Sequence, residues 1–275
     1  MYLVFDIGGT NMRIATSSDG KTLKETRIVP TPADDFEQGI KLLTQTANEL
    51  CAGEKIEAVS GGIAVVFNKD KSIATHTSHL HGWVNKPLKE TLQSNLNSPV
   101  HLENDTAMAG LGEATSGAGI GKSIVAYLTI STGIGGVRVV DQKIDKNSLG
   151  FEPGHQIIVI DGVLCHCGGK GHFEAYVGGY YLGRDYHQKG QDITDQAIWD
   201  KVTKYLAIGL NNTIVHWSPD VVILGGAVMK SISLDKVKSY LKDVLTIFPN
   251  PPDIVPAKLG DLAGLYGALQ LLSQN

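Results

Sequence analysis

The spacing of hydrophobic residues along the chain predicts alternating strands and helices. Short apolar runs bounded by glycine or proline indicate strands, and apolar residues three or four positions apart indicate helices. The expected strands are 3–5, 12–15, 56–66, 123–130, 137–140 and 221–224. The expected helices are 36–50, 106–114, 193–217, 234–248 and 263–272. Gly61 and Gly62 should interrupt the third strand, and prolines should leave 249–256 irregular. The alternation predicts an α/β fold.

Two strand–turn–strand units recur in this pattern, and each contains a glycine-rich turn. The first turn is 8–10 and the second is 131–136. Glycine lets a backbone approach an anion closely, and the N–H groups of such a turn form a concave nest that suits phosphate oxygens. Most glycine-rich hairpins are only hairpins, so neither turn alone indicates a ligand. The repetition does imply two related halves.

Two aspartates accompany these features. Asp6 ends a buried strand just before the first turn, where a carboxylate is unfavourable unless it meets a cation or a donor. Magnesium held beside phosphates would satisfy it. Asp105 comes at the start of the helix expected at 106–114, where it could equally cap free N–H groups.

Soft metal ligands cluster between Glu152 and Glu174. A zinc site that is closed and tetrahedral needs four nitrogen or sulfur ligands. The candidate ligands are His155, Cys165, Cys167 and His172, with His166 as a possible substitute. Without His172, the two cysteines could be ordinary buried thiols. Because four ligands fill a tetrahedral site, Glu152 and Glu174 are left to accept hydrogen bonds from another polar group.

Composition and charge narrow the class of protein. A chain of 275 residues with 42% hydrophobic residues can form one or two domains with substantial cores. The net charge of −4 and the lack of a dense Lys/Arg run argue against nucleic acid or an anionic membrane as a partner. No apolar run is long enough to span a bilayer, so a cytoplasmic protein is expected. Cys51 falls on a predicted helix, and three cysteines make no disulfide framework.

Motifs of other nucleotide-binding or hydrolytic classes do not match. The segment 116–123 nearly spells a Walker A loop, but Ser116 replaces its first glycine and a strand follows Ser123. No G-x-G-x-x-G lies between a strand and a helix, and no G-x-S-x-G is present.

Several motifs together resemble the ROK family of sugar kinases. They are Asp6-Ile7-Gly8-Gly9-Thr10, Glu103-Asn104-Asp105, Ser131-Thr132-Gly133-Ile134-Gly135-Gly136, Glu152-Pro153-Gly154-His155, Cys165-x-Cys167-Gly168-x-x-Gly171-His172-x-Glu174 and Val222-Ile223-Leu224-Gly225-Gly226. The resemblance covers nearly the whole chain. It implies an actin-like ATPase fold, of the ribonuclease H-like type, with two α/β lobes and a ligand cleft between them. The expected lobes are 1–113, completed by 259–275, and 114–258, which carries the zinc-binding loop.

The resemblance also implies ATP-dependent phosphorylation of a hexose, with glucose and its O6 hydroxyl as first choice. Asp105 would be the general base, and Asp6 would help to position Mg²⁺ indirectly. The implied sugar contacts are Asn104, Asp105, Glu152, His155 and Glu174. The implied nucleotide contacts are Gly8, Gly9, Thr10, Thr132, Gly133, Gly225 and Gly226. Zinc would be structural, fixing the loop that presents the sugar ligands.

Departures from the family pattern leave alternatives open. His172 stands where the family usually has a third cysteine, and Ala64-Val65 where a Pro-Gly usually helps to line the sugar pocket. The acceptor could instead be N-acetylmannosamine, N-acetylglucosamine or fructose. A non-catalytic sugar-binding relative is the alternative from another class. Repressors of this family carry a helix-turn-helix before the first turn, whereas five residues precede Asp6, which favours an enzyme. Since the family often forms dimers, a homodimer is possible.

Overall fold

A computed structural model describes residues 1–188 and 190–274. The chain divides into two compact units, each containing a five-stranded sheet. Unit 1 comprises Met1–Gly117, Lys146–Gly150 and Asp261–Asn275, and unit 2 comprises Ala118–Asp145 and Phe151–Gly260. Each unit is an α/β structure in its own right.

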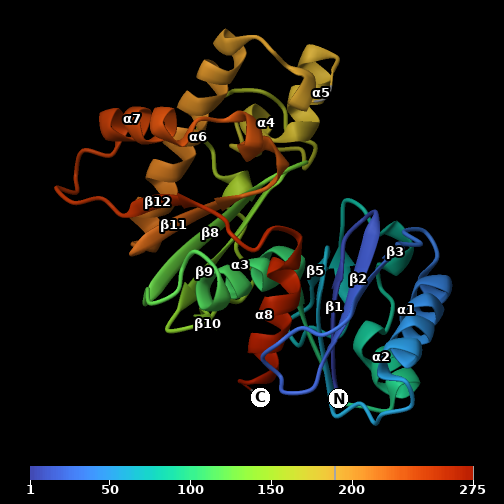
Figure 1. Cartoon of the computed structure of the whole chain (residues 1–275). Coiled ribbons are helices and arrows are strands. Elements are labelled where there is room, and N and C mark those ends of the chain that lie inside the picture. The colour runs from blue at the N-terminus through green and yellow to red at the C-terminus, as the bar shows by residue number, and fades with distance from the viewer. Residues whose placement is uncertain (189, 275) are drawn as a thin grey trace. The chain divides into compact units, whose positions relative to one another are not determined.

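Unit 1 is a mixed sheet with helices on both faces (Figure 1). Its strand order is β3-β2-β1-β4-β7, antiparallel from β3 to β1 and parallel from β1 to β7. The strands are β1 (Tyr2–Ile7), β2 (Asn11–Ser17), β3 (Thr26–Pro30), β4 (Ala58–Ile63) and β7 (Val100–Asn104), with the small pair β5 (Val66–Phe67) and β6 (Ala74–His76) outside the sheet. The helices are α1 (Phe36–Cys51), α2 (Leu88–Leu96), α3 (Asp105–Ser116) and α8 (Ala263–Leu272), with short 3₁₀ turns at His81–Trp83 and Gly260–Leu262.

Unit 2 repeats the same strand order and directions. Its sheet runs β10-β9-β8-β11-β12, antiparallel from β10 to β8 and parallel from β8 to β12. The strands are β8 (Ile124–Ile130), β9 (Ile134–Val140), β10 (Lys143–Ile144), β11 (Val221–Gly225) and β12 (Asp253–Pro256). The helices are α4 (Glu174–Val177), α5 (Gly179–Tyr186), α6 (Gln196–Trp217) and α7 (Leu234–Val244), with 3₁₀ turns at Pro153–His155, Gly190–Asp192 and Ala227–Ser231. The prediction of two related halves is therefore confirmed by topology.

The alternation of side chains along β1 decides where the functional groups of unit 1 lie. Leu3, Phe5 and Ile7 belong to the core that includes buried residues of α1 and α2. Val4 belongs to the separate core formed with α3 and α8. Because successive strand residues point to opposite faces, Asp6 lies on the same face as Val4. The strand thus places the Asp6 carboxylate against α3 and α8.

Helix α1 illustrates how local sequence specifies an element. Asp35 caps it by accepting a hydrogen bond of 3.0 Å from the N–H of Gln38. The apolar positions predicted at helical spacing are all buried, namely Phe36, Ile40, Leu43, Ala47 and Leu50. The helix ends where Ala52 adopts a left-handed conformation with φ of 48°.

The predicted interruption at Gly61 and Gly62 was wrong. Strand β4 runs unbroken through both glycines and ends at Ile63, and β5 is a separate short strand. The reason is packing: a Cβ atom on Gly61 would lie 2.0 Å from Cε2 of Phe5, its neighbour in β1. Glycine here makes room for an aromatic ring and does not break the strand.

Replacing Gly61 with alanine should destabilise unit 1 by about 3 kcal/mol, because the added methyl group overlaps the buried Phe5 ring. Chemical denaturation would measure the loss. Gly183→Ala is the matched control, since its Cβ would meet only the carbonyl oxygen of Gln188 at 3.7 Å. Equal denaturation midpoints for Gly61→Ala and the parent protein would contradict this account of β4.

Three further predicted boundaries differ from the structure. The second glycine turn is shorter than expected, because β9 begins at Ile134. Helix α7 ends at Val244 and not at 248, and Ile247 beyond it is 71% exposed, so its side chain adds no core contact that would extend the helix. The irregular segment expected at 249–256 contains β12, which pairs in parallel with β11. Pro256, the one proline of this segment within β12, is tolerated there because β12 is an edge strand.

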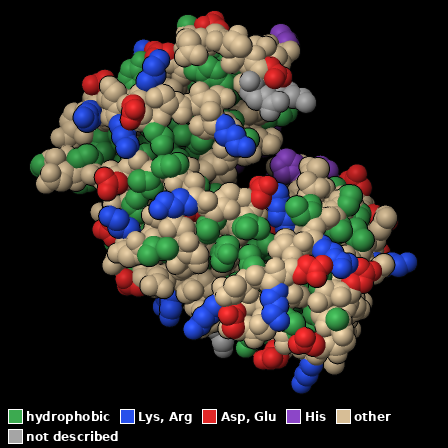
Figure 2. All heavy atoms as spheres, in the orientation of Figure 1, with side chains coloured by type: hydrophobic (Ala, Val, Ile, Leu, Met, Phe, Trp, Pro, Cys, Tyr) green, Lys and Arg blue, Asp and Glu red, His purple; other side chains and the backbone are tan. Residues whose placement is uncertain are grey.

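Charged side chains of both signs are interspersed over the face shown in Figure 2. No helix within 1–188 and 190–274 combines the length and the apolar character needed to cross a membrane.

Candidate functional site

The first glycine turn follows β1 directly and is tied to neighbouring chain segments. The N–H of Gly8 donates to the carbonyl oxygen of Asn11 at 3.0 Å, and the hydroxyl of Thr31 donates to the carbonyl oxygen of Gly8 at 2.8 Å. A Cβ atom on Gly9 would lie 2.6 Å from Cβ of His79. Close approach of the His79 segment therefore requires glycine at position 9.

Asp6 and Asp105 approach each other around Gly62. A Cβ atom on Gly62 would lie 3.1 Å from Cα of Asp105 and 3.5 Å from Oδ1 of Asp6. A Cβ atom on Gly264 in α8 would lie 2.8 Å from Cγ of Asp6. Two glycines thus leave the space that the paired carboxyl groups occupy. Sheet register brings the two aspartates together. Asp6 pairs with Gly62 in β4, and Gly62 pairs with Glu103 in β7, two residues before Asp105.

The environment of Asp6 disfavours its charged form. Burial first, and then the neighbouring Asp105, raise the pKa of Asp6 to about 7, while the guanidinium of Arg13 opposes them. Arg13 lies 4.0 Å from Oδ2 of Asp6 and 3.2 Å from Oδ2 of Asp261. A cation would relieve the repulsion between the two carboxylates, which is the property expected of a site beside a metal-bound phosphate.

Asp105 is the first residue of α3 and is not its N-cap. The capping role belongs to Asn104, whose Oδ1 accepts the N–H of Ala107 at 3.1 Å. The alternative interpretation of Asp105 as the helix cap was therefore wrong. Burial raises the pKa of Asp105, although the N–H of Thr106, 2.8 Å from its Oδ1, and the charge of His79 lower it. Asn104 also donates to the carbonyl oxygen of Val65 at 3.1 Å, so its amide is held on both sides.

In unit 2, the second glycine turn lies against the start of α5 and against Glu174. The N–H of Gly179 donates to the carbonyl oxygen of Ser131 at 2.7 Å, and the N–H of Tyr180 donates to the carbonyl oxygen of Thr132 at 2.9 Å. A Cβ atom on Gly133 would lie 2.8 Å from Oε2 of Glu174. Two segments with separate sequence motifs therefore meet in unit 2.

The glycines after β11 also permit close chain contacts. A Cβ atom on Gly225 would lie 2.8 Å from the hydroxyl oxygen of Tyr127. Gly226 has φ of 95°, and its Cβ would lie 2.2 Å from the carbonyl oxygen of Ile130. Both glycines are thus explained by packing, whatever further role they have.

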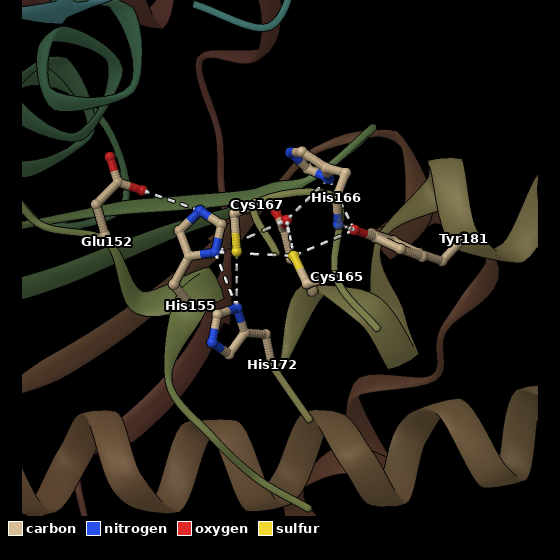
Figure 3. Close-up of polar contacts among 8 residues, drawn as sticks. Glu152, His155, Cys165, His166, Cys167, His172 and Tyr181 are labelled. Carbon is tan, nitrogen blue, oxygen red and sulfur yellow. Dashed lines mark hydrogen bonds and ion pairs between the residues drawn. The ribbon is translucent and has the colours of Figure 1, made fainter. Parts of the chain in front are cut away.

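The four predicted zinc ligands converge in the loop that precedes α4 (Figure 3). The ligand atoms of His155, Cys165, Cys167 and His172 all lie within 4.8 Å of one another. Nδ1 of His172 lies 3.3 Å from Nδ1 of His155 and 3.2 Å from Sγ of Cys167, and Sγ of Cys165 lies 4.0 Å from Nδ1 of His155. Tetrahedral zinc with ordinary bond lengths holds such atoms about 3.3 to 3.8 Å apart. The donor set therefore fits zinc in both chemistry and spacing.

His155 has distinct surroundings at its two ring nitrogens. Nδ1 faces the ligand cluster, and Nε2 lies 3.9 Å from a carboxylate oxygen of Glu152 (Figure 3). A carboxylate beside the outer nitrogen is a common way to orient a metal-bound histidine. Glu174 approaches the cluster from another side, with Oε1 3.2 Å from Sγ of Cys165.

Without a metal, burial favours the uncharged forms of two of these ligands, Cys165 and His172. Burial raises the pKa of the Cys165 thiol to about 11. Burial, and then the nearby charge of His155, lower the pKa of His172. A divalent cation would reverse this preference at Cys165, because it binds the thiolate and competes with the proton.

The sequence analysis did not predict three residues that contact the candidate site residues, namely Arg13, His79 and Tyr181. Arg13 contacts Asp6 and Asp261, His79 lies against the first turn, and the hydroxyl of Tyr181 reaches Cys165. None of the three belongs to a spaced motif. Apart from the contact between Arg13 and Asp6, their contacts join residues that are 15 or more positions apart in the chain. The sequence carried no signal for them.

The chain belongs to the ROK family, whose model matches residues 2–275. Among curated relatives, it is 27% identical to a glucokinase of Streptomyces coelicolor, over 97% of this chain and 95% of that protein. It is 26% identical to an N-acetyl-D-glucosamine kinase of Escherichia fergusonii, over 98% of both.

Solved structures agree with the family assignment. A ROK hexokinase from Thermus thermophilus superposes with a TM-score of 0.89 at 28% identity, over 100% of this chain and 99% of that one. A ROK glucokinase from Streptomyces griseus, in complex with glucose and AMPPNP, superposes with a TM-score of 0.83 at 25% identity and the same coverage. The prediction of an actin-like ATPase fold is confirmed, as is that of an ATP-dependent sugar kinase.

Proposed function

We propose that the protein phosphorylates glucose at O6 with Mg-ATP as donor. The main supporting observation is the partly buried pair Asp6 and Asp105 beside the Gly8–Thr10 turn, in a chain of the ROK family. In this proposal, Asp105 accepts the proton of the sugar hydroxyl as its oxygen attacks the γ-phosphate. Phosphoryl transfer depends mainly on alignment and charge neutralisation, so one base with phosphate-binding N–H groups and Mg²⁺ is sufficient.

The remaining site residues divide between sugar and nucleotide. Asn104, Glu152, His155 and Glu174 would bind the other sugar hydroxyls. The phosphates and the adenosine would be bound by Gly8, Gly9, Thr10, Thr132, Gly133, Gly225 and Gly226. Asp6 would help to position Mg²⁺ without binding the ion directly. Nδ1 of His155 faces His172 and Cys165, and Nε2 lies on the side of Glu152, which supports a double role for this ring as zinc ligand and sugar contact.

We further propose that His155, Cys165, Cys167 and His172 hold a structural zinc ion. Four protein ligands leave no open position for substrate, so bound zinc would supply rigidity to the loop and not Lewis-acid chemistry. Glu152 and Glu174, which flank the ligand set, would then be presented at fixed angles.

N-acetylglucosamine is the second candidate acceptor, because a relative with that activity is about as similar as the glucokinase. ADP release with Mg-ATP should be measured for glucose, N-acetylglucosamine, N-acetylmannosamine and fructose. We expect glucose to give the highest kcat/KM. A higher kcat/KM for an acetylated sugar would refute glucose as the preferred acceptor while keeping the kinase assignment. No turnover with any of these sugars would refute the proposed enzymatic activity.

Asp6→Asn should raise stability at pH 8 while lowering activity by at least about tenfold. A carboxyl group whose folded pKa is about 7, above its ordinary value of 3.8, destabilises the ligand-free fold progressively as pH rises between these values. Asparagine removes that charge, so the melting temperature should rise by several degrees at pH 8 and by less at pH 5. Thermal melts at both pH values would measure it, and a lower melting temperature at pH 8 would contradict the argument.

A further inference from the structure

The hydroxyl of Tyr181 lies at the centre of a partly buried hydrogen-bond group beside the zinc ligands (Figure 3). Tyr181 lies in α5 and is only 2% exposed. Its oxygen accepts the backbone N–H of His166 at 2.9 Å, lies 2.7 Å from Nδ1 of the same histidine and lies 3.2 Å from Sγ of Cys165. Three polar atoms therefore surround one phenol oxygen.

For the tautomer of His166 that is protonated at Nδ1, the proton count of this group gives a direction to each bond. A tyrosine hydroxyl has one proton and can accept from two donors. If Nδ1 of His166 carries a proton, the two donors of His166 fill both acceptor positions. The single proton of Tyr181 is then directed at Sγ of Cys165. In this arrangement Nδ1 of His166 is occupied, so it is not available as a substitute zinc ligand.

We propose that Tyr181 is a positioning residue for the metal centre, acting by donating a hydrogen bond to the metal-bound thiolate of Cys165. The inference rests on the zinc site of the proposed function and extends it. A thiolate can only accept hydrogen bonds, so the Tyr181 hydroxyl is a donor that remains useful once metal has displaced the thiol proton. Glu174, 3.2 Å from the same sulfur, has no proton to offer when ionised. The bond to a charged sulfur is also stronger than one to a neutral thiol.

The neighbouring residue Tyr180 provides a matched control. It lies one position earlier in α5, its side chain is 55% exposed, and its ring packs edge to face against that of Tyr181 at 5.2 Å. Tyr180→Phe therefore makes the same chemical change within one helical turn but removes no bond to sulfur.

The test compares the parent protein, Tyr181→Phe and Tyr180→Phe. Zinc affinity would be measured by competition with a chromophoric chelator, and Co²⁺ would be substituted for zinc to record the thiolate-to-metal absorption band. We expect Tyr181→Phe to bind zinc about tenfold more weakly and to shift the cobalt band to lower energy, because the sulfur lone pair loses a donor. Tyr180→Phe should match the parent protein in both measurements.

A double-mutant cycle separates this role from general packing. In a Cys165→Ala background, Tyr181→Phe should change zinc affinity by less than about twofold, because the thiolate through which it acts is gone and alanine offers no other acceptor. Equal affinity and equal cobalt spectra for Tyr181→Phe and the parent would overturn the inference while leaving the zinc site intact. A tenfold loss that persists in the Cys165→Ala background would also overturn it. Absence of stoichiometric metal binding by the parent protein would overturn the proposed zinc site and the inference together.

Discussion

Asp105→Asn should lower kcat by at least about a hundredfold, with a much smaller change in KM for the sugar. A positioned general base contributes about 10²- to 10⁴-fold to the rate, and asparagine cannot accept the hydroxyl proton. The amide has nearly the same size, so the contact of Asp105 Oδ1 with the N–H of Thr106 can be kept. Steady-state ADP release with the preferred sugar measures both constants.

The control for this variant is Asp235→Asn, an exposed aspartate in the first turn of α7. It should retain parental kcat and KM. The pH dependence of kcat/KM adds a second test. Burial raises the pKa of Asp105, so activity should fall on the acid side as the carboxyl group is protonated, at a pH above the ordinary aspartate value. Turnover by Asp105→Asn within tenfold of the parent would remove Asp105 from the role of base.

His172→Ala should reduce bound zinc from about one ion per chain to a small fraction and lower kcat/KM for the sugar by at least about tenfold. Its Nδ1 lies within 3.3 Å of ligand atoms of both His155 and Cys167, so its loss opens the proposed tetrahedral site. The loop bearing Glu152 and Glu174 would then lose its fixed geometry. Elemental analysis and steady-state kinetics measure the two effects.

His166→Ala is the matched control for the ligand set. The Nδ1 of His166 contacts the Tyr181 hydroxyl at 2.7 Å and lies in a second group with Cys165 and Glu174. At saturating zinc, this variant should still bind about one ion per chain. If His166→Ala loses the ion and His172→Ala keeps it, His166 is the ligand and the proposed set is wrong. Zinc-free protein with full activity would refute a structural role for the metal.

Local sequence determined the elements that depend on near neighbours. The helix predicted at 263–272 is confirmed at both ends, and the hairpin around Gly8 to Thr10 is confirmed as β1 and β2. Periodicity succeeds here because burying one helical face or one strand face requires residues at fixed short intervals. It failed at Gly61, where a ring from another strand made glycine necessary inside β4.

The motifs likewise identified the family, and they supplied most residues of the proposed site by residue type, since metal ligands and phosphate turns need particular side chains at close spacing. Only the tertiary structure decided which of these residues meet. Sheet register brings Asp6 to Asp105, and packing of α5 brings the Tyr181 hydroxyl to Cys165. Such contacts join residues far apart in the chain, and they depend on strand order and side-chain packing, which no local spacing encodes.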